Sequence, residues 1–129
     1  REIGEPRLRG MLRLAGYIPN SDLPAIYNEA SAFLYTSLRE SFGIPQLEAM
    51  ACGTPVVTSA ASAIPEVAGQ GAILVDPTDP TAIADALLRL ETDAAFRARQ
   101  VAYGLERVKR FSWEKTARHL LTLYESLGK

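Results

Sequence analysis

Short apolar runs alternate along the chain with longer segments in which apolar residues recur at helical spacing. The runs at 32–37, 55–59 and 72–76 are typical of strands covered on both faces, and MLRLAGY at 11–17 predicts a further strand that ends near Gly16. Helical spacing predicts helices beginning near Pro24, at 44–52, from Pro80 to 92, over 94–110 and over 113–127, with a single helical turn near 64–69.

The ends of these helices carry recognisable signals. Ser21 or Asp22, Asp79 and Ser112 are predicted N-caps, because their side-chain oxygens can accept the first free amides of a helix. The last helix has a stripe of Trp113, Ala117, Leu120, Tyr124 and Leu127, which is predicted to pack in the core.

Strands that alternate with helices over 11–92 indicate right-handed βαβ units and a parallel sheet. We therefore predict an α/β fold with about four strands. Residues 1–10 mix charged residues with Gly and Pro and show no periodicity, so they are predicted to form an irregular N-terminal arm, and the domain is expected over 11–129.

Composition limits the classes of function. The chain of 129 residues fits one domain, and 14 Lys and Arg against 15 Asp and Glu predict no nucleic-acid or anionic-membrane surface. Cys52 is the only cysteine, so an internal disulfide and a thiolate metal cluster are excluded, and a reducing, cytoplasmic location is expected. No apolar run approaches the roughly 18 residues of a membrane span.

The segment after the strand at 32–37 is the strongest candidate site. Ligands of such sheets bind at the carboxyl ends of the strands, and here Leu38 to Gly43 form a turn that carries Glu40 into a helix N-terminus. The amides of Phe42, Gly43 and Ile44 would favour an anion there. We expect the Glu40 carboxylate and the amides of Phe42 and Gly43 to face one cavity.

Glu48 is the one carboxylate inside the otherwise apolar helix at 44–52. Burial of a carboxylate is costly unless it is paired or hydrogen-bonded, and ligand hydroxyls are one such partner. Alternatively, Glu40 is a solvated loop acid and Glu48 lies on an exposed stripe near Arg39 or Arg89. Glu66 could likewise be a ligand contact or simply an acid at a helix terminus.

The string ESFGIPQLEAMACGTPVV, residues 40–57, resembles the signature of retaining glycosyltransferases of GT-B type, the glycosyl transferases group 1 family. That signature has two glutamates separated by seven residues, as Glu40 and Glu48 are, followed by Ala-Met-Ala-x-Gly-x-Pro-Val. Ser41 stands where the family usually has glycine. The similarity extends over about 11–127, and it implies a three-layer, Rossmann-like C-terminal domain.

The resemblance implies a role for each residue of the candidate site. Glu48 would hydrogen-bond the ribose of a nucleotide-diphosphate-sugar donor, and Glu40 would be the catalytic residue. The backbone of Ser41, Phe42, Gly43 and Ile44 would hold the donor sugar and diphosphate, while Tyr17 and Ile18 would lie near the base. Neither a metal nor a cofactor besides the donor substrate is implied.

The resemblance also implies that parts of the enzyme lie elsewhere. The family neutralises the diphosphate with an Arg and Lys pair on an earlier strand–helix unit and binds the acceptor with an N-terminal domain, whereas Arg7, Arg9 and Arg13 lack the surrounding pattern. We therefore expect a truncated C-terminal domain, inactive alone, whose partner is the N-terminal part of the enzyme. Any peripheral membrane contact is expected only through that part.

A non-catalytic domain that keeps this scaffold for binding or assembly remains an alternative. A dinucleotide-dependent oxidoreductase is disfavoured, because no Gly-x-Gly-x-x-Gly follows any predicted strand.

The family's strand order, 3-2-1-4-5-6, separates the strand near 11–16 from the strand at 32–37. We therefore predict an uncovered sheet edge. Either it associates with a second copy, with residues 1–20 exchanged between copies, or strand 11–16 pairs directly with strand 32–37.

Overall fold

The computed structural model describes residues 10–128. Apart from Gly10, the predicted arm at 1–10 lies outside the described residues, and so do Arg7 and Arg9. The elements follow one another as α1 (Leu23–Glu29), β1 (Phe33–Tyr35), α2 (Ile44–Ala51), β2 (Val56–Ser59), α3 (Ile64–Ala68), the 3₁₀ helix η2 (Gly69–Gly71), β3 (Ala72–Val75), α4 (Pro80–Thr92), α5 (Ala94–Val108) and α6 (Trp113–Ser126).

The sheet has three parallel strands in the order β1-β2-β3. Phe33 lies opposite Val56, and Val56 lies opposite Ala72. The α/β class and the parallel sheet are confirmed, with three strands where the sequence predicted about four. The four residues of β2 are all buried, which explains the continuous apolar run that marks this central strand.

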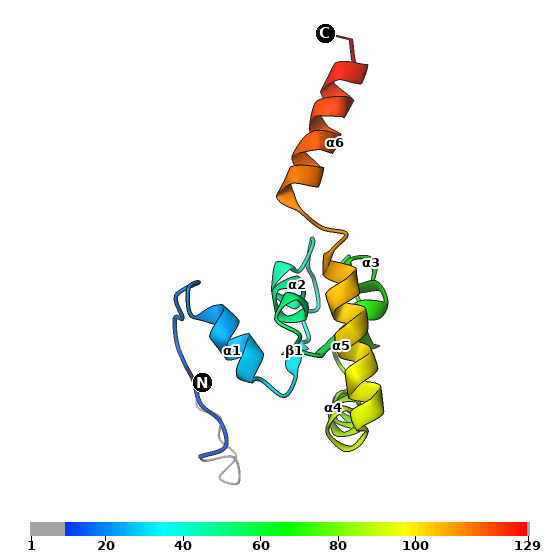
Figure 1. The fold of residues 1–129 in the computed structure, drawn as a ribbon. Coiled ribbons are helices and arrows are strands. Elements are labelled where there is room, and N and C mark those ends of the chain that lie inside the picture. Colours follow the sequence, from blue (N-terminus) through cyan, green and yellow to red (C-terminus); the bar gives the residue numbers. More distant parts are fainter. Residues whose placement is uncertain (1–9, 129) are drawn as a thin grey trace.

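Helices cover both faces of the sheet, so the fold has three layers. On one face Tyr27, Ala49 and Met50 pack with Val56 of β2, which brings α1 and α2 together. On the other face Ala86 and Leu90 of α4 pack against Val57 and Val75. Helix α5 contacts α2, α4 and η2 (Figure 1).

The predicted strand at 11–17 is not formed. Residues 12–19 adopt no regular structure, and they neither extend the sheet nor pair with β1. Leu14 and Tyr17 are 85% and 89% exposed. A strand is stabilised by hydrogen bonds to a neighbour, and within the described residues none lies beside this segment. The predicted pairing of strand 11–16 with strand 32–37 is therefore wrong.

The prediction that the Trp113 stripe packs in the core is also wrong. Helix α6 has no buried residue among those described, and Trp113 and Tyr124 are 81% and 66% exposed. The helix projects away from the sheet and its covering helices (Figure 1). Its apolar face is present as the periodicity predicted, but no element of the described chain covers it.

The predicted caps are largely confirmed. Asp79 accepts hydrogen bonds from the amides of Thr81 and Ala82, and Ser112 accepts one from the amide of Lys115. Asp22 is the N-cap residue of α1, but its side chain makes no capping hydrogen bond. Of the helices described between residues 10 and 128, none combines the length and apolarity needed to cross a membrane.

Candidate functional site

The turn between β1 and α2 forms the centre of the candidate site. Gly43 is the N-cap of α2 with a left-handed backbone, φ 81° and ψ 54°, and Pro45 occupies the first turn. A Cβ on Gly43 would lie 2.9 Å from Nε2 of Gln46, so both the backbone angle and the close approach favour glycine here. No side chain caps the N-terminal amides of α2.

Gln46 lies beneath this turn and is fully buried. Its Nε2 donates to the carbonyl oxygen of Phe42 at 3.4 Å, while its Oε1 is buried without a hydrogen-bond partner among the described residues. Gln46 was not predicted from the sequence. A glutamine in a helix that is otherwise almost wholly apolar is the signal that could have found it.

Glu40 is half-buried and held by two neighbours. Its Oε1 accepts a hydrogen bond from the hydroxyl of Tyr35 at 2.5 Å, and its backbone carbonyl accepts one from Oγ of Ser62 at 2.7 Å. Ser62 follows β2 and has a left-handed backbone, φ 57°, which is uncommon for a residue other than glycine. The loops that follow β1 and β2 are therefore joined at Glu40.

Glu48 lies on the exposed side of α2. Its Oε2 accepts a hydrogen bond from the hydroxyl of Tyr27 at 3.2 Å. Glu48 is thus exposed, as the alternative interpretation predicted. Its hydrogen-bond partner, however, is a tyrosine of α1 rather than Arg39 or Arg89. Tyr27 and Tyr35 were both missed in the sequence, because no local spacing connects them to the glutamates.

Burial and the neighbouring glutamates together raise the pKa values of the Tyr27 and Tyr35 phenols. Burial, followed by the hydrogen bond and the charge of Glu40, raises the pKa of Tyr35 to about 12. Burial, followed by the charge and the hydrogen bond of Glu48, raises the pKa of Tyr27 to about 12. Both hydroxyls consequently stay protonated and able to donate throughout the neutral pH range.

The other predicted residues are distributed around this centre. Ser41 is exposed, and Phe42 and Ile44 are 41% and 45% exposed. Tyr17 is strongly exposed and Ile18 is half-buried, both in the irregular segment before α1. The structure thus brings Glu40 and Glu48 into one network with α1 and β1, and it places Tyr17 and Ile18 outside helices and strands.

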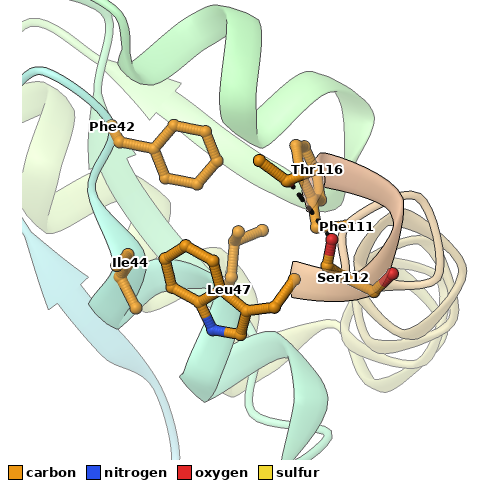
Figure 2. A pocket seen from close by; sticks show the side chains of 7 residues that line it. Phe42, Ile44, Leu47, Phe111, Ser112 and Thr116 are labelled. Carbon is orange, nitrogen blue, oxygen red and sulfur yellow. Dashed lines mark hydrogen bonds between the residues drawn. The ribbon is translucent and has the colours of Figure 1, made fainter. Parts of the chain in front are cut away.

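An apolar cavity of about 410 Å³ lies between the start of α2 and the start of α6. In Figure 2, Phe42 and Leu47 lie on one side of it and Phe111 on the other, and the rings of Phe42 and Phe111 meet edge to face at 5.7 Å. Its lining residues are Phe42, Ile44, Leu47, Phe111, Ser112, Trp113 and Thr116. Glu40 and Gly43, which the sequence placed in one cavity with Phe42, do not line this one.

Glu66 lies in the first turn of α3. Its backbone carbonyl and that of Val67 accept hydrogen bonds from the guanidinium of Arg107, which also lies over the ring of Phe111, 5.1 Å from its centroid. Its place at a helix terminus agrees with one of the two predicted interpretations, and a ligand contact stays a prediction.

Comparison with known proteins places the chain in a family. The family described as glycosyl transferases group 1 matches residues 1–107. The O-antigen chain mannosyltransferase B of Escherichia coli is 42% identical over 118 residues, covering 92% of this chain and 31% of that protein. A D-inositol 3-phosphate glycosyltransferase of Corynebacterium urealyticum is 40% identical over 111 residues, covering 84% of this chain and 26% of that protein.

Solved structures agree with this assignment. The sucrose-phosphate synthase of Thermosynechococcus elongatus superposes with a TM-score of 0.84 at 34% identity, covering 94% of this chain and 31% of that one. The C-terminal domain of a glycosyl transferase group 1 family protein from Francisella tularensis gives a TM-score of 0.66 at 32% identity, covering 74% of this chain and 50% of that one. The chain spans about a third or less of the two curated relatives and has the GT-B C-terminal fold; it belongs to the group 1 glycosyltransferases.

Proposed function

We propose that this chain is the donor-binding part of a retaining glycosyltransferase, which transfers a sugar from a nucleotide-diphosphate-sugar to an acceptor. Membership of the family supports sugar transfer. The observation that carries the finer proposal is a pair of carboxylates, Glu40 in the loop before α2 and Glu48 within α2, each with one oxygen hydrogen-bonded to a tyrosine hydroxyl. A carboxylate has about four lone-pair sites, so a single phenol leaves acceptor capacity for the hydroxyls of a sugar or ribose.

The surroundings of each glutamate suggest its role. Glu48 is exposed on α2 and is proposed to accept hydrogen bonds from the ribose hydroxyls. Glu40 is half-buried in the loop that follows β1 and is proposed to act at the transferred sugar. The backbone of residues 41–44 leads into a helix N-terminus without a side-chain cap, which suits the diphosphate. Tyr17 and Ile18 are proposed to approach the base, and no metal or cofactor takes part in the proposal.

Transfer itself is proposed to need the N-terminal part of the enzyme, which would bind the acceptor. The short coverage of the curated relatives supports this partner. Stabilisation of the leaving diphosphate is a large electrostatic requirement of glycosyl transfer, and the proposal assigns it to cationic residues of that part. The free Cys52 supports a reducing, cytoplasmic location.

A non-catalytic assembly domain is the second candidate function. The observation that favours it is the uncovered apolar face of α6 beside the apolar cavity, because a contiguous exposed apolar surface marks an interaction site. Transfer of labelled sugar by the polypeptide that carries the chain would exclude this function, whereas nucleotide binding with no transfer would support it.

Self-association through the edge of β1 is proposed as a further partnership. β1 pairs only with β2 within the described residues, and Leu34 is 43% exposed there. An unpaired parallel edge tends to recruit another strand. Light scattering over a hundredfold range of concentration should show a rising mass, and a constant monomer mass would contradict the proposal.

Titration calorimetry of the full-length polypeptide that carries this chain, with UDP, GDP and ADP, tests the donor site. One of the three should bind, and Glu48→Ala should weaken its binding about tenfold to a hundredfold, the range expected for a charge-assisted hydrogen bond. In the full-length polypeptide that carries this chain, Glu40→Ala should leave the nucleoside diphosphate affinity nearly unchanged and lower the transfer rate. Asp85→Ala, on α4 and exposed, is the matched control. Unchanged affinity in Glu48→Ala would count against the ribose contact.

A further inference from the structure

Three aromatic rings from α1 and β1 form a row that connects the two glutamates. Tyr27 and Phe33 meet edge to face, with ring centroids 5.3 Å apart and an interplanar angle of 89°. Phe33 and Tyr35 are stacked with centroids 5.9 Å apart and an angle of 17°. Phe33 and Tyr35 alternate along one strand and therefore lie on the same face of the sheet. The two phenols at the ends of the row consequently keep a fixed separation.

Each end of this aromatic row donates a hydrogen bond to one glutamate. Tyr35 donates to Oε1 of Glu40, and Tyr27 donates to Oε2 of Glu48. Tyr27 is 8% exposed and Tyr35 is half-buried, so packing restricts the directions of both rings. Glu48 is exposed, and an exposed glutamate without such a donor would sample several rotamers.

Threonines on or just before the central strand fix the backbones of both tyrosines. Oγ1 of Thr54 donates to the carbonyl oxygen of Tyr27 at 2.5 Å, in a buried position. Oγ1 of Thr58 donates to the carbonyl oxygen of Tyr35 at 3.0 Å. The aromatic row is thus tied to β2, the most buried strand, at both ends.

We propose that Tyr27 and Tyr35 are positioning residues, Tyr27 orienting the Glu48 carboxylate towards the nucleotide and Tyr35 orienting the Glu40 carboxylate towards the transferred sugar, with Phe33 setting the distance between them. The proposal rests on the proposed function, because it assumes that the glutamates contact the donor. It adds two residues that touch the ligand only through the glutamates. Their loss should therefore weaken recognition without abolishing it.

The first experiment measures the hydrogen bonds themselves and needs no ligand. With tyrosines labelled at Cζ, NMR titration of the chain follows each phenol separately. Glu40→Gln should lower the pKa of Tyr35 below about 12, because a negative charge beside the phenol is lost while burial, the largest cause of the raised pKa, is kept, and Glu48→Gln should do the same for Tyr27. If neither substitution changes the pKa of its tyrosine, the proposal is overturned.

The second experiment measures what the hydrogen bonds do for binding, by calorimetry of the full-length polypeptide that carries this chain with UDP and GDP and with UDP-glucose and GDP-mannose. Tyr27→Phe should weaken binding of the nucleoside diphosphate about threefold to tenfold, the range for one hydrogen bond. Tyr35→Phe should leave the affinity for the nucleoside diphosphate unchanged. It should reduce only the additional affinity of the nucleotide sugar over its nucleoside diphosphate. Tyr103→Phe, a half-exposed tyrosine of α5, is the control and should change neither.

The outcomes separate this proposal from the function on which it rests. A full-length wild-type polypeptide that binds none of the four ligands overturns the proposed function and the positioning role with it, whatever the titration shows. A full-length wild-type polypeptide that binds, with both phenylalanine variants unchanged, overturns the positioning role alone. Equal effects of Tyr27→Phe and Tyr35→Phe on the nucleoside diphosphate would also overturn it, because a general structural role predicts no such split. Circular dichroism melting of each variant verifies that it is folded.

Discussion

Helices α5 and α6 are of similar length and are both amphipathic, yet they have opposite surroundings. In α5, Gly104 is buried against Met50 and Gly71, and Arg107 bonds to carbonyls at the end of α3. In α6, no described residue is buried, although its apolar residues follow one stripe. Figure 1 shows α5 against the body and α6 leaving it. The comparison teaches that helical periodicity predicts an apolar face but not whether a partner covers it.

The largest expected effect comes from a larger side chain at Gly104, where α5, unlike α6, packs closely against other elements. A Cβ on Gly104 would lie 3.2 Å from Cγ of Met50 and 3.4 Å from the carbonyl oxygen of Gly71. Gly104→Leu should therefore lower the free energy of unfolding by about 3 kcal/mol in urea denaturation, the scale of overpacking a tight contact. The matched change in α6, Ala117→Leu at an exposed position, should alter it by less than about 0.5 kcal/mol. Similar losses in the free energy of unfolding for both variants would contradict the conclusion that α5 is packed and α6 is not.

The arginines of the two helices provide the next contrast. Arg107→Ala removes two hydrogen bonds to backbone carbonyls and the contact with Phe111, and it should lower the free energy of unfolding by about 2 kcal/mol. Arg118 of α6 pairs with Glu114 between side chains that are 74% and 78% exposed, so Arg118→Ala should change it by less than about 0.5 kcal/mol. Thermal melts of the two variants should show a clear difference in Tm. Equal Tm values would contradict the prediction that Arg107 stabilises the fold more than Arg118 does.

The N-caps of α5 and α6 can also be compared, because each side chain accepts a hydrogen bond from the backbone amide three residues later. Asp93 accepts a hydrogen bond from the amide of Phe96 at the start of α5, and Ser112 accepts one from the amide of Lys115 at the start of α6. Asp93→Ala should cost about 1 kcal/mol of global stability. Ser112→Ala should instead increase amide hydrogen exchange in α6 alone, because local fraying there breaks no core contact. A global loss in Ser112→Ala would show that α6 unfolds together with the sheet.

The smallest effect is expected at the start of α6. Trp113 is the largest side chain of the stripe and is 81% exposed. Trp113→Ala should change the free energy of unfolding by less than about 0.5 kcal/mol, as measured by circular dichroism in urea. A loss of 2 kcal/mol or more would indicate that the Trp113 side chain, which lines the apolar cavity, is buried in solution.

Local chemistry made most of the α/β core predictable. The buried run at 55–59 became the central strand, and the turn that carries Glu40 leads into α2 at Gly43, as its residue types predicted. Caps such as Asp79 were predictable because they depend on residues two or three positions away. The strand expected at 11–17 failed because strand formation depends on a neighbour elsewhere in the molecule.

In the candidate site, too, the local features were predictable and the contacts between distant residues were not. The sequence placed Glu40 in the turn that follows a strand and Glu48 within the next helix. It did not indicate Tyr27, Tyr35 or Ser62, because the hydrogen bonds to the glutamates are made by residues of other elements or across a turn with no characteristic spacing.

The sequence by itself therefore determined the α/β class, the helix caps, the apolar face of each helix and the two glutamates, because each depends on residues that are neighbours along the chain. Only the tertiary structure decided that α5 is packed and α6 is not, that residues 11–17 remain outside the sheet, and which tyrosine meets which glutamate. Those outcomes depend on whether a complementary surface lies at the right distance in space, and the spacing of residue types along a chain carries little information about that distance.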